Sequence, residues 1–269
     1  MNINIRAVVQ SKNRDLYNKI PSFLFTLFEK IIHQDEINTI LGKYSNLRGI
    51  EFIRATLNEL NIEREVVIKH PLNREQDNSI ILVSNHPLGG VDGFALAEAI
   101  TAKYGSVKIV VNDILMNVEP VKELFIPINK HGRQSSKYAA SLNDALASSV
   151  PILYFPAGLC SRKIDGKIED LKWHNSFLKK AIEHNRDVVL VKVNSLNSSL
   201  FYTSAWLRKY FKIKANLEMI LLPSELFKKR NGNIQMIFGE RLKIEELKNC
   251  ENIDKAVIDI RRRCYELDK

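Results

Sequence analysis

Apolar runs of strand length alternate with stretches of helical periodicity through most of this chain. Seven such runs occur after residue 79, and helical patterns at 93–103, 134–148 and 172–185 separate some of them. This alternation predicts an α/β fold in which helices cover both faces of a central sheet. The predicted strands are 80–83, 107–111, 124–128, 152–155, 188–193, 219–222 and 234–238.

Residues 1–62 have helical periodicity without strand-like runs. Apolar residues recur at helical spacing in two segments, and Gly42 and Gly49 fall between these segments. The recurring positions are Leu24, Leu27, Phe28 and Ile31, followed by Ile50, Ile53, Leu57 and Leu60. The pattern predicts a helical N-terminal subdomain at 1–62 and an α/β domain at 63–269.

The charge balance narrows the choice of partners. Among 269 residues, 40 Lys and Arg against 31 Asp and Glu give a formal charge of +9. Such an excess favours an anionic partner, which can be nucleic acid, anionic lipid or an acidic carrier protein. No RNA-binding signature occurs, so we expect no nucleic acid partner.

Cysteine count and hydropathy bear on the compartment. Three cysteines form no paired framework and no Cys-x-x-Cys, which favours a reducing environment. The N-terminus lacks a signal-peptide pattern, and the longest apolar stretch, 23–28, is far shorter than the roughly 20 residues of a spanning helix. We expect a cytoplasmic protein that, if its substrate is a lipid, lies on the inner face of the membrane.

The first candidate for chemistry is the loop at residues 84–93, which follows a predicted buried strand and precedes a predicted helix. Ligands of α/β sheets bind beyond the carboxyl ends of strands, where this loop lies. Gly89 and Gly90 allow the chain to turn back, so that Asp92 can approach the imidazole of His86. A carboxylate on one ring nitrogen orients the histidine, and the other nitrogen can take a proton from a hydroxyl.

Two other interpretations of this loop stay open. Asp92 can be an N-cap in an ordinary strand-to-helix loop, with His86 an incidental polar residue. A metal site is a third interpretation, although no second His or Cys stands nearby at ligand spacing, and we therefore expect no metal.

The second candidate is the stretch 153–163, in which a predicted strand ends in a Pro-Gly turn followed by two cations. Backbone N–H groups of such a turn can face an oxyanion, and Arg162 can bind a phosphate or carboxylate through two hydrogen bonds. An ordinary turn with a solvated Arg-Lys pair explains the same pattern. Cys160 has no local histidine partner, so we interpret it as a passive thiol.

Taken together, the two loops resemble the glycerolipid and lysophosphatidic acid acyltransferase family. The chain is most similar to the branch that carries the label hemolysin and includes acyltransferases completing ornithine and glycine lipids. The resemblance rests on Asn85-His86-Pro87 with Asp92-Gly93, and on Phe155-Pro156-Ala157-Gly158 with Ser161-Arg162. Weaker support comes from 125–129 and 238–240, and the similarity covers about residues 65–243. It implies an α/β fold with a mixed central sheet flanked by helices.

The chain departs from the family pattern in two places, and the second bears on the acceptor. The family has four residues between His and Asp, whereas five stand here, as in the hemolysin-like branch. The second motif usually reads Phe-Pro-Glu-Gly, and Ala157 occupies the Glu position. Loss of that carboxylate beside Arg162 and Lys163 makes the site more positive, which suits an acceptor carrying its own carboxylate.

The resemblance also implies a mechanism of direct transfer. His86 acts as general base on an acceptor hydroxyl, Asp92 orients the imidazole, and the alkoxide attacks a thioester on acyl carrier protein or coenzyme A, without a resident cofactor. Backbone donors near Gly158 face the oxyanion. The expected substrate-binding residues are Asn85, Gly158, Ser161, Arg162, Lys163, Lys130 and Arg133. The expected acceptor is a lyso-lipid, preferably an N-acylated ornithine or glycine lipid; lysophosphatidic acid and a non-catalytic, membrane-binding role are the alternatives.

Two segments are candidates for membrane contact. Residues 205–214 interleave aromatic residues with cations, a pattern that suits a bilayer interface. The alternative is a surface helix that buries Trp206, Leu207 and Tyr210 in the protein's own core. The aromatic helix around 23–28 is the other docking candidate, unless it packs among the N-terminal helices.

Overall fold

A seven-stranded sheet forms the centre of the protein. We describe it from a computed structural model, which covers residues 2–12, 14–70, 79–128, 136–213 and 216–269. The strand order is β1-β9-β8-β2-β5-β3-β4, and every neighbouring pair is parallel except β8 with β9. The strands are β1 (Glu63–Ile68), β2 (Ile80–Ser84), β3 (Lys108–Asn112), β4 (Phe125–Ile128), β5 (Ile152–Tyr154), β8 (Asp187–Asn194) and β9 (Asn233–Leu242). The predicted mixed sheet is therefore confirmed.

The remaining elements are helices and one short hairpin. Strands β6 (Arg162–Ile164) and β7 (Lys167–Glu169) form the antiparallel hairpin. The α-helices are α1 (Ile5–Lys12), α2 (Arg14–Lys19), α3 (Ser22–Ile31), α4 (Gln34–Lys43), α5 (Gly49–Glu59), α6 (Val91–Tyr104), α7 (Ser136–Ala147), α8 (Ser176–Glu183), α9 (Ser199–Tyr210), α10 (Leu222–Lys228), α11 (Ile244–Lys248) and α12 (Ile253–Tyr265). The 3₁₀ helices are η1 (Asp113–Asn117), η2 (Glu119–Leu124) and η3 (Leu217–Leu221).

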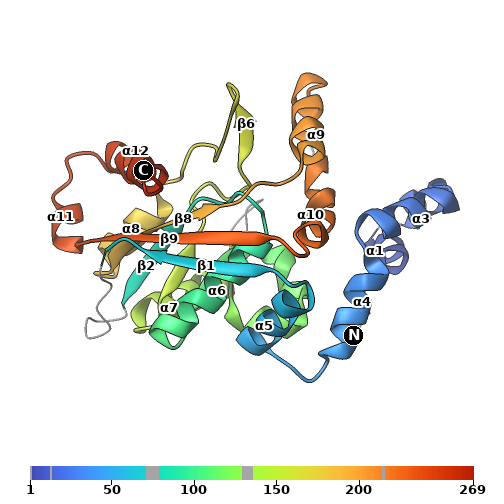
Figure 1. Cartoon of the computed structure of the whole chain (residues 1–269), viewed down its shortest axis with the longest axis horizontal. Helices are drawn as coiled ribbons and strands as arrows, with labels where there is room; N and C mark the ends of the chain where they lie inside the picture. Colours follow the sequence, from blue (N-terminus) through green and yellow to red (C-terminus); the bar gives the residue numbers. More distant parts are fainter. Residues whose placement is uncertain (1, 13, 71–78, 129–135, 214–215) are drawn as a thin grey trace.

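Strand β2 shows why the central runs are apolar throughout. All five of its residues are buried. Ile80 and Leu82 belong to the core formed with α5 and α6, whereas Ile81 and Val83 belong to the core formed with α8 and α12. Figure 1 shows α5 and α6 on one side of the sheet and α12 on the other. Because successive side chains point to opposite faces, a strand covered on both sides loses the polar alternation of an exposed sheet.

Five helices precede the first strand, as the helical pattern of residues 1–62 predicted. The last of them, α5, packs against α6 and η2, and its Phe52, Ile53 and Leu57 are buried in the same core as Leu96. Helices α1, α3 and α4 extend away from the sheet (Figure 1). The division into two domains at residue 62 stays a prediction.

Three elements differ from the predicted pattern. The run 219–222 is not a strand, because it spans the end of η3 and the start of α10, where Pro223 occupies the first turn. Strand β1 was missed, since it is a half-exposed edge strand that starts Glu-Arg-Glu. The β6–β7 hairpin was missed because its strands have only three residues each and are mostly exposed. None of the helices in the described ranges is long and apolar enough to cross a membrane.

The sheet brings the two motif loops together. Strands β8, β2 and β5 are adjacent and parallel, with Ser84 paired to Val191 and Val83 paired to Tyr154. Their carboxyl ends therefore lie at one edge of the sheet. Strand β2 leads into the His86 loop, β5 leads into the Pro-Gly turn, and β8 leads towards α9. This edge is where an α/β sheet places its ligand.

Candidate active site

His86 and Asp92 form a hydrogen-bonded pair in the loop after β2. The distance from His86 Nδ1 to Asp92 Oδ2 is 3.0 Å. The opposite ring nitrogen, Nε2, has no hydrogen bond to any residue in the described ranges, and the His86 side chain keeps 17% of its surface exposed. The geometry therefore presents one oriented imidazole nitrogen to an incoming group.

The Asp92 carboxylate organises the whole loop. It is fully buried in the first turn of α6 and accepts four backbone hydrogen bonds. Oδ2 accepts from the N–H groups of Leu88 and Gly89, and Oδ1 accepts from those of Gly90 and Gly93. Gly89 has φ +76°, and a Cβ there would meet Cys160 Sγ, so glycine is required on both counts.

The electrostatics of the pair favour an ion pair. Burial alone would raise the pKa of Asp92, but the His86 charge and the hydrogen bonds outweigh it and hold the pKa below its usual value. Burial likewise opposes the charged imidazole, yet the Asp92 carboxylate wins and raises the pKa of His86 above its usual value. The ring of His86 also stacks on Phe155 of the second loop, with centroids 4.0 Å apart. An imidazole in this setting is well suited to accept and hold a proton.

Asn85 connects β2 to β8. Its amide donates to the carbonyl of Val193 at 2.9 Å and accepts from the N–H of Val193 at 2.7 Å. Both bonds are buried, so this side chain holds the strand ends together next to His86. The predicted role of Asn85 in contacting substrate stays a prediction.

The second loop follows β5 and turns at Gly158. Gly158 has φ +62°, and its N–H donates to the carbonyl of Phe155 at 2.9 Å. Ala157 is buried in the core cluster that also contains Trp173. The Ser161 N–H donates to the carbonyl of His86 at 2.8 Å, so the two loops are joined directly. The predicted oxyanion donors near Gly158 stay a prediction.

Asp170 is a site residue that the sequence analysis missed. Its Oδ1 accepts from the backbone N–H of His86 at 3.1 Å and from Ser161 Oγ at 2.6 Å, and Oδ2 accepts from Trp173 Nε1 at 2.9 Å. Its own N–H donates to the hydroxyl of Tyr265 in α12. Burial raises the pKa of Asp170 above its usual value. The carboxylate stands 84 positions from His86, and no local pattern links them.

Arg162 lies in an internal ion-pair cluster. Its guanidinium is 2.7 Å from Glu218 Oε1 and donates to the carbonyl of Cys160. Arg208 Nε of α9 lies 2.9 Å from the other oxygen of Glu218, close enough for an ion pair but without hydrogen-bond geometry, and Arg162 also lies over the ring of Phe201. Arg162 and Glu218 are both buried. Two guanidiniums around one carboxylate leave a net positive charge, but an acceptor headgroup could bind Arg162 only by competing with Glu218.

The other residues singled out in the sequence lie in different settings. Lys163 is exposed in β6. Lys130 and Arg133 lie outside the described residues. Cys160 is completely buried, and burial raises its pKa to about 12, which fits the passive thiol expected from the sequence.

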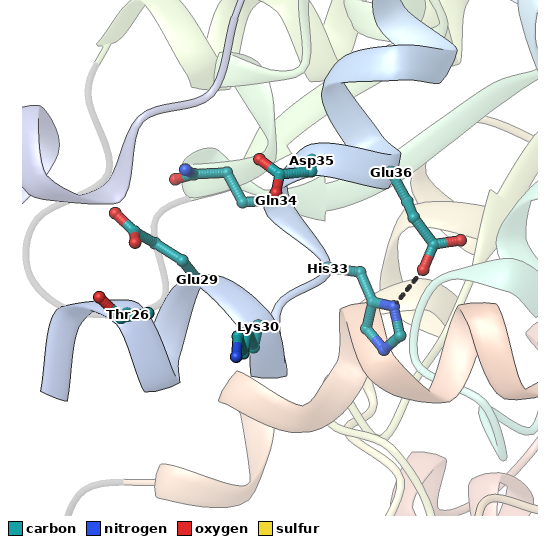
Figure 2. Close-up of a pocket in the computed structure, with 7 residues that line it drawn as sticks. All are labelled: Thr26, Glu29, Lys30, His33, Gln34, Asp35 and Glu36. Atoms are coloured by element: carbon teal, nitrogen blue, oxygen red, sulfur yellow. Dashed lines mark hydrogen bonds and ion pairs between the residues drawn. The ribbon is translucent and has the colours of Figure 1, made fainter. Parts of the chain in front are cut away.

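A pocket at the α3–α4 junction contains none of these residues. Figure 2 shows that charged and polar side chains line it, with His33 bonded to Glu36 at 2.7 Å. His33 has φ +53° and stacks on Phe227, so it shapes the turn between the two helices. His33 also has a carboxylate partner, but the Glu36 side chain is 41% exposed and pairs with Arg230 as well, whereas that of Asp92 is fully buried. We therefore assign the chemistry to the sheet edge. Among the described residues, no group of three or more His, Cys, Asp or Glu is placed to hold a metal ion.

An oriented imidazole beside a buried carboxylate, at the carboxyl ends of adjacent parallel strands, can deprotonate a hydroxyl and return the proton to a leaving group. The site has the parts that an acyl transfer to a hydroxyl needs. A family comparison agrees, since the acyltransferase family model matches residues 7–269. The chain belongs to the acyltransferase family and is an enzyme that transfers acyl groups.

Two curated relatives are similar over most of their length. One is a lyso-glycine lipid O-acyltransferase of Bacteroides thetaiotaomicron, 38% identical over 239 residues, which are 88% of this chain and 87% of the relative. A protein of the same name from Phocaeicola vulgatus is also 38% identical, over 88% of this chain and 85% of its own. Among solved structures, a 1-acyl-sn-glycerophosphate (LPA) acyltransferase of Thermotoga maritima matches with a TM-score of 0.46 and 18% identity, over 91% of this chain and 93% of that one.

Proposed function

We propose that this enzyme moves a fatty acyl group from an acyl thioester to the hydroxyl of an N-acylated amino-acid lyso-lipid, preferably a glycine or ornithine lipid. The observation that carries the chemistry is the 3.0 Å contact between His86 Nδ1 and the buried Asp92 carboxylate, in a His86 side chain that stays 17% exposed. The 38% identity to two lyso-glycine lipid O-acyltransferases, each covered over at least 85% of its length, supports the acceptor class.

The transfer proceeds in one displacement without a covalent enzyme intermediate. His86 Nε2 takes the proton of the acceptor hydroxyl as its oxygen attacks the thioester carbonyl. The Asp92 carboxylate stabilises the imidazolium, and it is already ionised because its pKa lies below the usual value. When the tetrahedral intermediate collapses, the C–S bond breaks and the thiolate takes the proton back from His86. After this proton return, His86 is neutral again and the enzyme is back in its starting state.

The acceptor carries an acyl amide on its amino acid, and the free hydroxyl on that chain receives the second acyl group. Ala157 places no carboxylate in the second loop, and the Arg162–Glu218–Arg208 cluster has one more cation than anion. That surplus charge favours a carboxylate headgroup, although the headgroup must compete with Glu218 for hydrogen bonds from Arg162. Each hydrogen bond from Arg to a charged group contributes roughly 1.5–3 kcal/mol.

The donor is acyl carrier protein or acyl coenzyme A, and the lipid acceptor is reached from an anionic membrane surface. Both donors are acidic, and the chain has a formal charge of +9, so long-range attraction favours either encounter. The lipid substrate requires the enzyme to work peripherally at the membrane, on the cytoplasmic face where these thioesters occur.

The test is a purified reaction with a labelled acyl donor and one acceptor at a time. Lyso-glycine lipid, lyso-ornithine lipid and lysophosphatidic acid are offered separately, with His86→Ala as the catalytic control. We expect transfer to one or both amino-acid lipids and little to lysophosphatidic acid. Strong transfer to lysophosphatidic acid alone rejects the acceptor and keeps the acyltransferase. Absence of transfer to all three acceptors overturns the proposed acceptor.

A further inference from the structure

Exposed apolar side chains are concentrated in one segment of the surface. Of the sixteen large apolar residues that are exposed in the described ranges, eight belong to residues 196–220. They are Leu196, Leu200, Trp206, Leu207, Tyr210, Phe211, Ile213 and Ile220. The core alternative for this helix is wrong, because Trp206, Leu207 and Tyr210 face outward. A concentration of this kind marks an interaction surface.

The outer end of α9 forms a continuous aromatic face. Trp206 and Tyr210 are one helical turn apart and stack with ring centroids 5.6 Å apart, and Phe211 packs edge-on against Tyr210 at 5.2 Å. The inner side of the same helix buries Phe201, Tyr202 and Ala205. We call Trp206, Leu207, Tyr210, Phe211 and Ile213 the α9 apolar face. The rings contact one another rather than the protein interior, so the face is already assembled.

Cations surround this face. Lys209 and Lys212 are exposed and have no ion pair within the described part of the chain. Strand β6 contacts α9, and its hairpin presents exposed Lys163, Ile164 and Lys167. Figure 1 shows α9 and β6 projecting from the same side of the sheet. Aromatic rings with flanking lysines suit the region where acyl chains meet anionic headgroups.

The face is connected to the catalytic loop by buried contacts. Helix α9 follows β8, whose carboxyl end lies beside that of β2. Ahead of α9, the Asn197 amide donates to the carbonyl of Pro87, next to His86, at 3.1 Å. Behind it, Leu222 approaches Gly89 so closely that a Cβ on Gly89 would lie 2.8 Å from it. A membrane contact here therefore occurs within the segment that supports the catalytic loop.

We propose that the α9 apolar face docks on an anionic phospholipid bilayer, with Lys209, Lys212 and the β6–β7 lysines on headgroup phosphates. The purpose of this docking, which is to bring the catalytic loop to a lipid acceptor, rests on the proposed function; the docking itself does not. Net charge, the Trp-Tyr-Lys composition and continuity with the site all favour a bilayer over a protein partner. Helix α3, with Phe23 and Leu27 exposed, is the other surface to test.

The chain offers an internal reporter of docking. It has two tryptophans, of which Trp173 is 2% exposed and Trp206 is 59% exposed. A blue shift of tryptophan fluorescence on adding substrate-free vesicles therefore reports Trp206. We expect the shift with vesicles of phosphatidylglycerol and phosphatidylcholine, and a weaker shift with phosphatidylcholine alone. No shift on anionic vesicles at low salt overturns the proposal.

Two variants and two controls complete the test by vesicle co-sedimentation. The triple change Trp206→Ala, Tyr210→Ala and Phe211→Ala should reduce binding to anionic vesicles at least about tenfold with an unchanged Tm. Lys209→Gln with Lys212→Gln should reduce it about tenfold and lessen its salt dependence. Ile258→Ala, at another exposed apolar position, should have no effect. Phe23→Ala with Leu27→Ala should change it less than the triple variant, and the reverse result overturns the proposal.

Activity measurements separate docking from catalysis. With acceptor dispersed in detergent, the triple variant should turn over like the wild type, whereas with acceptor embedded in anionic vesicles it should fall about tenfold. Absence of transfer by the wild type in both formats counts against the proposed function and leaves the fluorescence result to decide docking. Equal activity of both proteins on vesicles overturns the docking role.

Discussion

The two motif loops lie side by side, yet each is organised by a different buried carboxylate. Asp92 holds the first loop from within, six residues after His86, and it has a charged partner and four backbone donors. Asp170 holds the second loop from outside and accepts from neutral side chains and one backbone N–H. The pKa of Asp92 is lowered and that of Asp170 is raised.

The opposite pKa shifts indicate that Asp92 takes part in proton transfer and that Asp170 has a positioning role. A carboxylate beside an imidazole is kept ionised and can stabilise the imidazolium that forms during proton transfer. A carboxylate that accepts hydrogen bonds only from neutral donors makes no direct ion pair, so its main effect is to fix the positions of those donors. Asp92 stabilises the imidazolium and also fixes the loop backbone, whereas Asp170 positions the His86 backbone and Ser161. Substitutions in each loop can test this difference.

The largest effect should come from His86. His86→Ala removes the general base, and turnover should fall by about 10²–10⁴ because that is the usual contribution of such catalysis. Purified protein, a labelled thioester donor and single-turnover analysis give the rate. His184→Ala is a matched control, since its side chain has the same 17% exposure, and it should leave turnover unchanged. A near-wild-type rate in His86→Ala would exclude the general-base mechanism.

The next effect concerns Asp92. Asp92→Asn removes the charge from the His86 hydrogen bond, and a bond to a charged group is worth roughly 1.5–3 kcal/mol, so kcat/KM should fall about tenfold to a hundredfold. In the wild type, His86 must be neutral to act as base, and its pKa is raised, so kcat/KM should rise with pH through a midpoint above the usual 6.5. In Asp92→Asn the pKa of His86 falls. The acid limb, which is the rising part of the profile of kcat/KM against pH, should therefore move to lower pH.

The structure also predicts a stability cost for this variant. Each carboxylate oxygen of Asp92 accepts hydrogen bonds from two backbone N–H groups, and in Asp92→Asn an NH₂ group replaces one of these oxygens. Each buried N–H donor that is left without an acceptor costs roughly 1–3 kcal/mol. As the N-cap that the sequence also allowed, Asp92 could be replaced by Asn with little loss, because Asn is an equally good N-cap residue. Asp187→Asn is the control, because Asp187 also accepts a buried backbone N–H yet lies outside both motif loops. It should lower Tm without moving the acid limb.

A smaller effect is expected at Asp170. In Asp170→Asn, one of the donors His86 N–H, Ser161 Oγ–H and Trp173 Nε1–H loses its acceptor, so stability should fall by roughly 1–3 kcal/mol and kcat/KM by about tenfold. The Asp170 charge helps to raise the pKa of His86, so the acid limb should shift down, by less than in Asp92→Asn. Tyr265→Phe, which removes the acceptor for the Asp170 N–H, should affect Tm alone. If the acid limb of Asp170→Asn lies at the same pH as that of the wild type, Asp170 has only a structural role.

The sequence predicted the parts of the fold and site that are local. Strand β2 was readable because burial on both faces made all five residues apolar or small, and the His86–Asp92 pair was readable because two glycines and a short loop separate its members. Residues 219–222 look like a strand by apolarity alone, but they form the end of η3 and the start of α10, since Glu218 pairs there with Arg162 and Arg208 and Pro223 starts the next helix.

Long-range partners were beyond local reasoning. Nothing near Asp170 indicates that it binds His86 across 84 residues, and nothing near Arg162 indicates Glu218, 56 residues away. Arg162 looked like a free cation for a headgroup because its sequence neighbours are a serine and a lysine. Tertiary packing placed it against Glu218 and Phe201 instead, so that its role depends on groups that only the fold brings together.

The smallest effect should come from Cys160, which tests whether the second loop supplies a nucleophile. The thiol is fully buried with its pKa raised to about 12, so at neutral pH it is protonated and out of reach of a thioester. Its sulfur instead fills the space beside Gly89, whose absent Cβ would collide with it. Cys160→Ala should therefore keep kcat/KM within about twofold while lowering the free energy of unfolding by about 1 kcal/mol, because a small cavity forms between the loops. Iodoacetamide should modify the native wild type, in which Cys250 is more accessible, without loss of activity. A tenfold or larger loss of turnover in Cys160→Ala at unchanged Tm would instead point to an acyl-cysteine intermediate and overturn direct transfer.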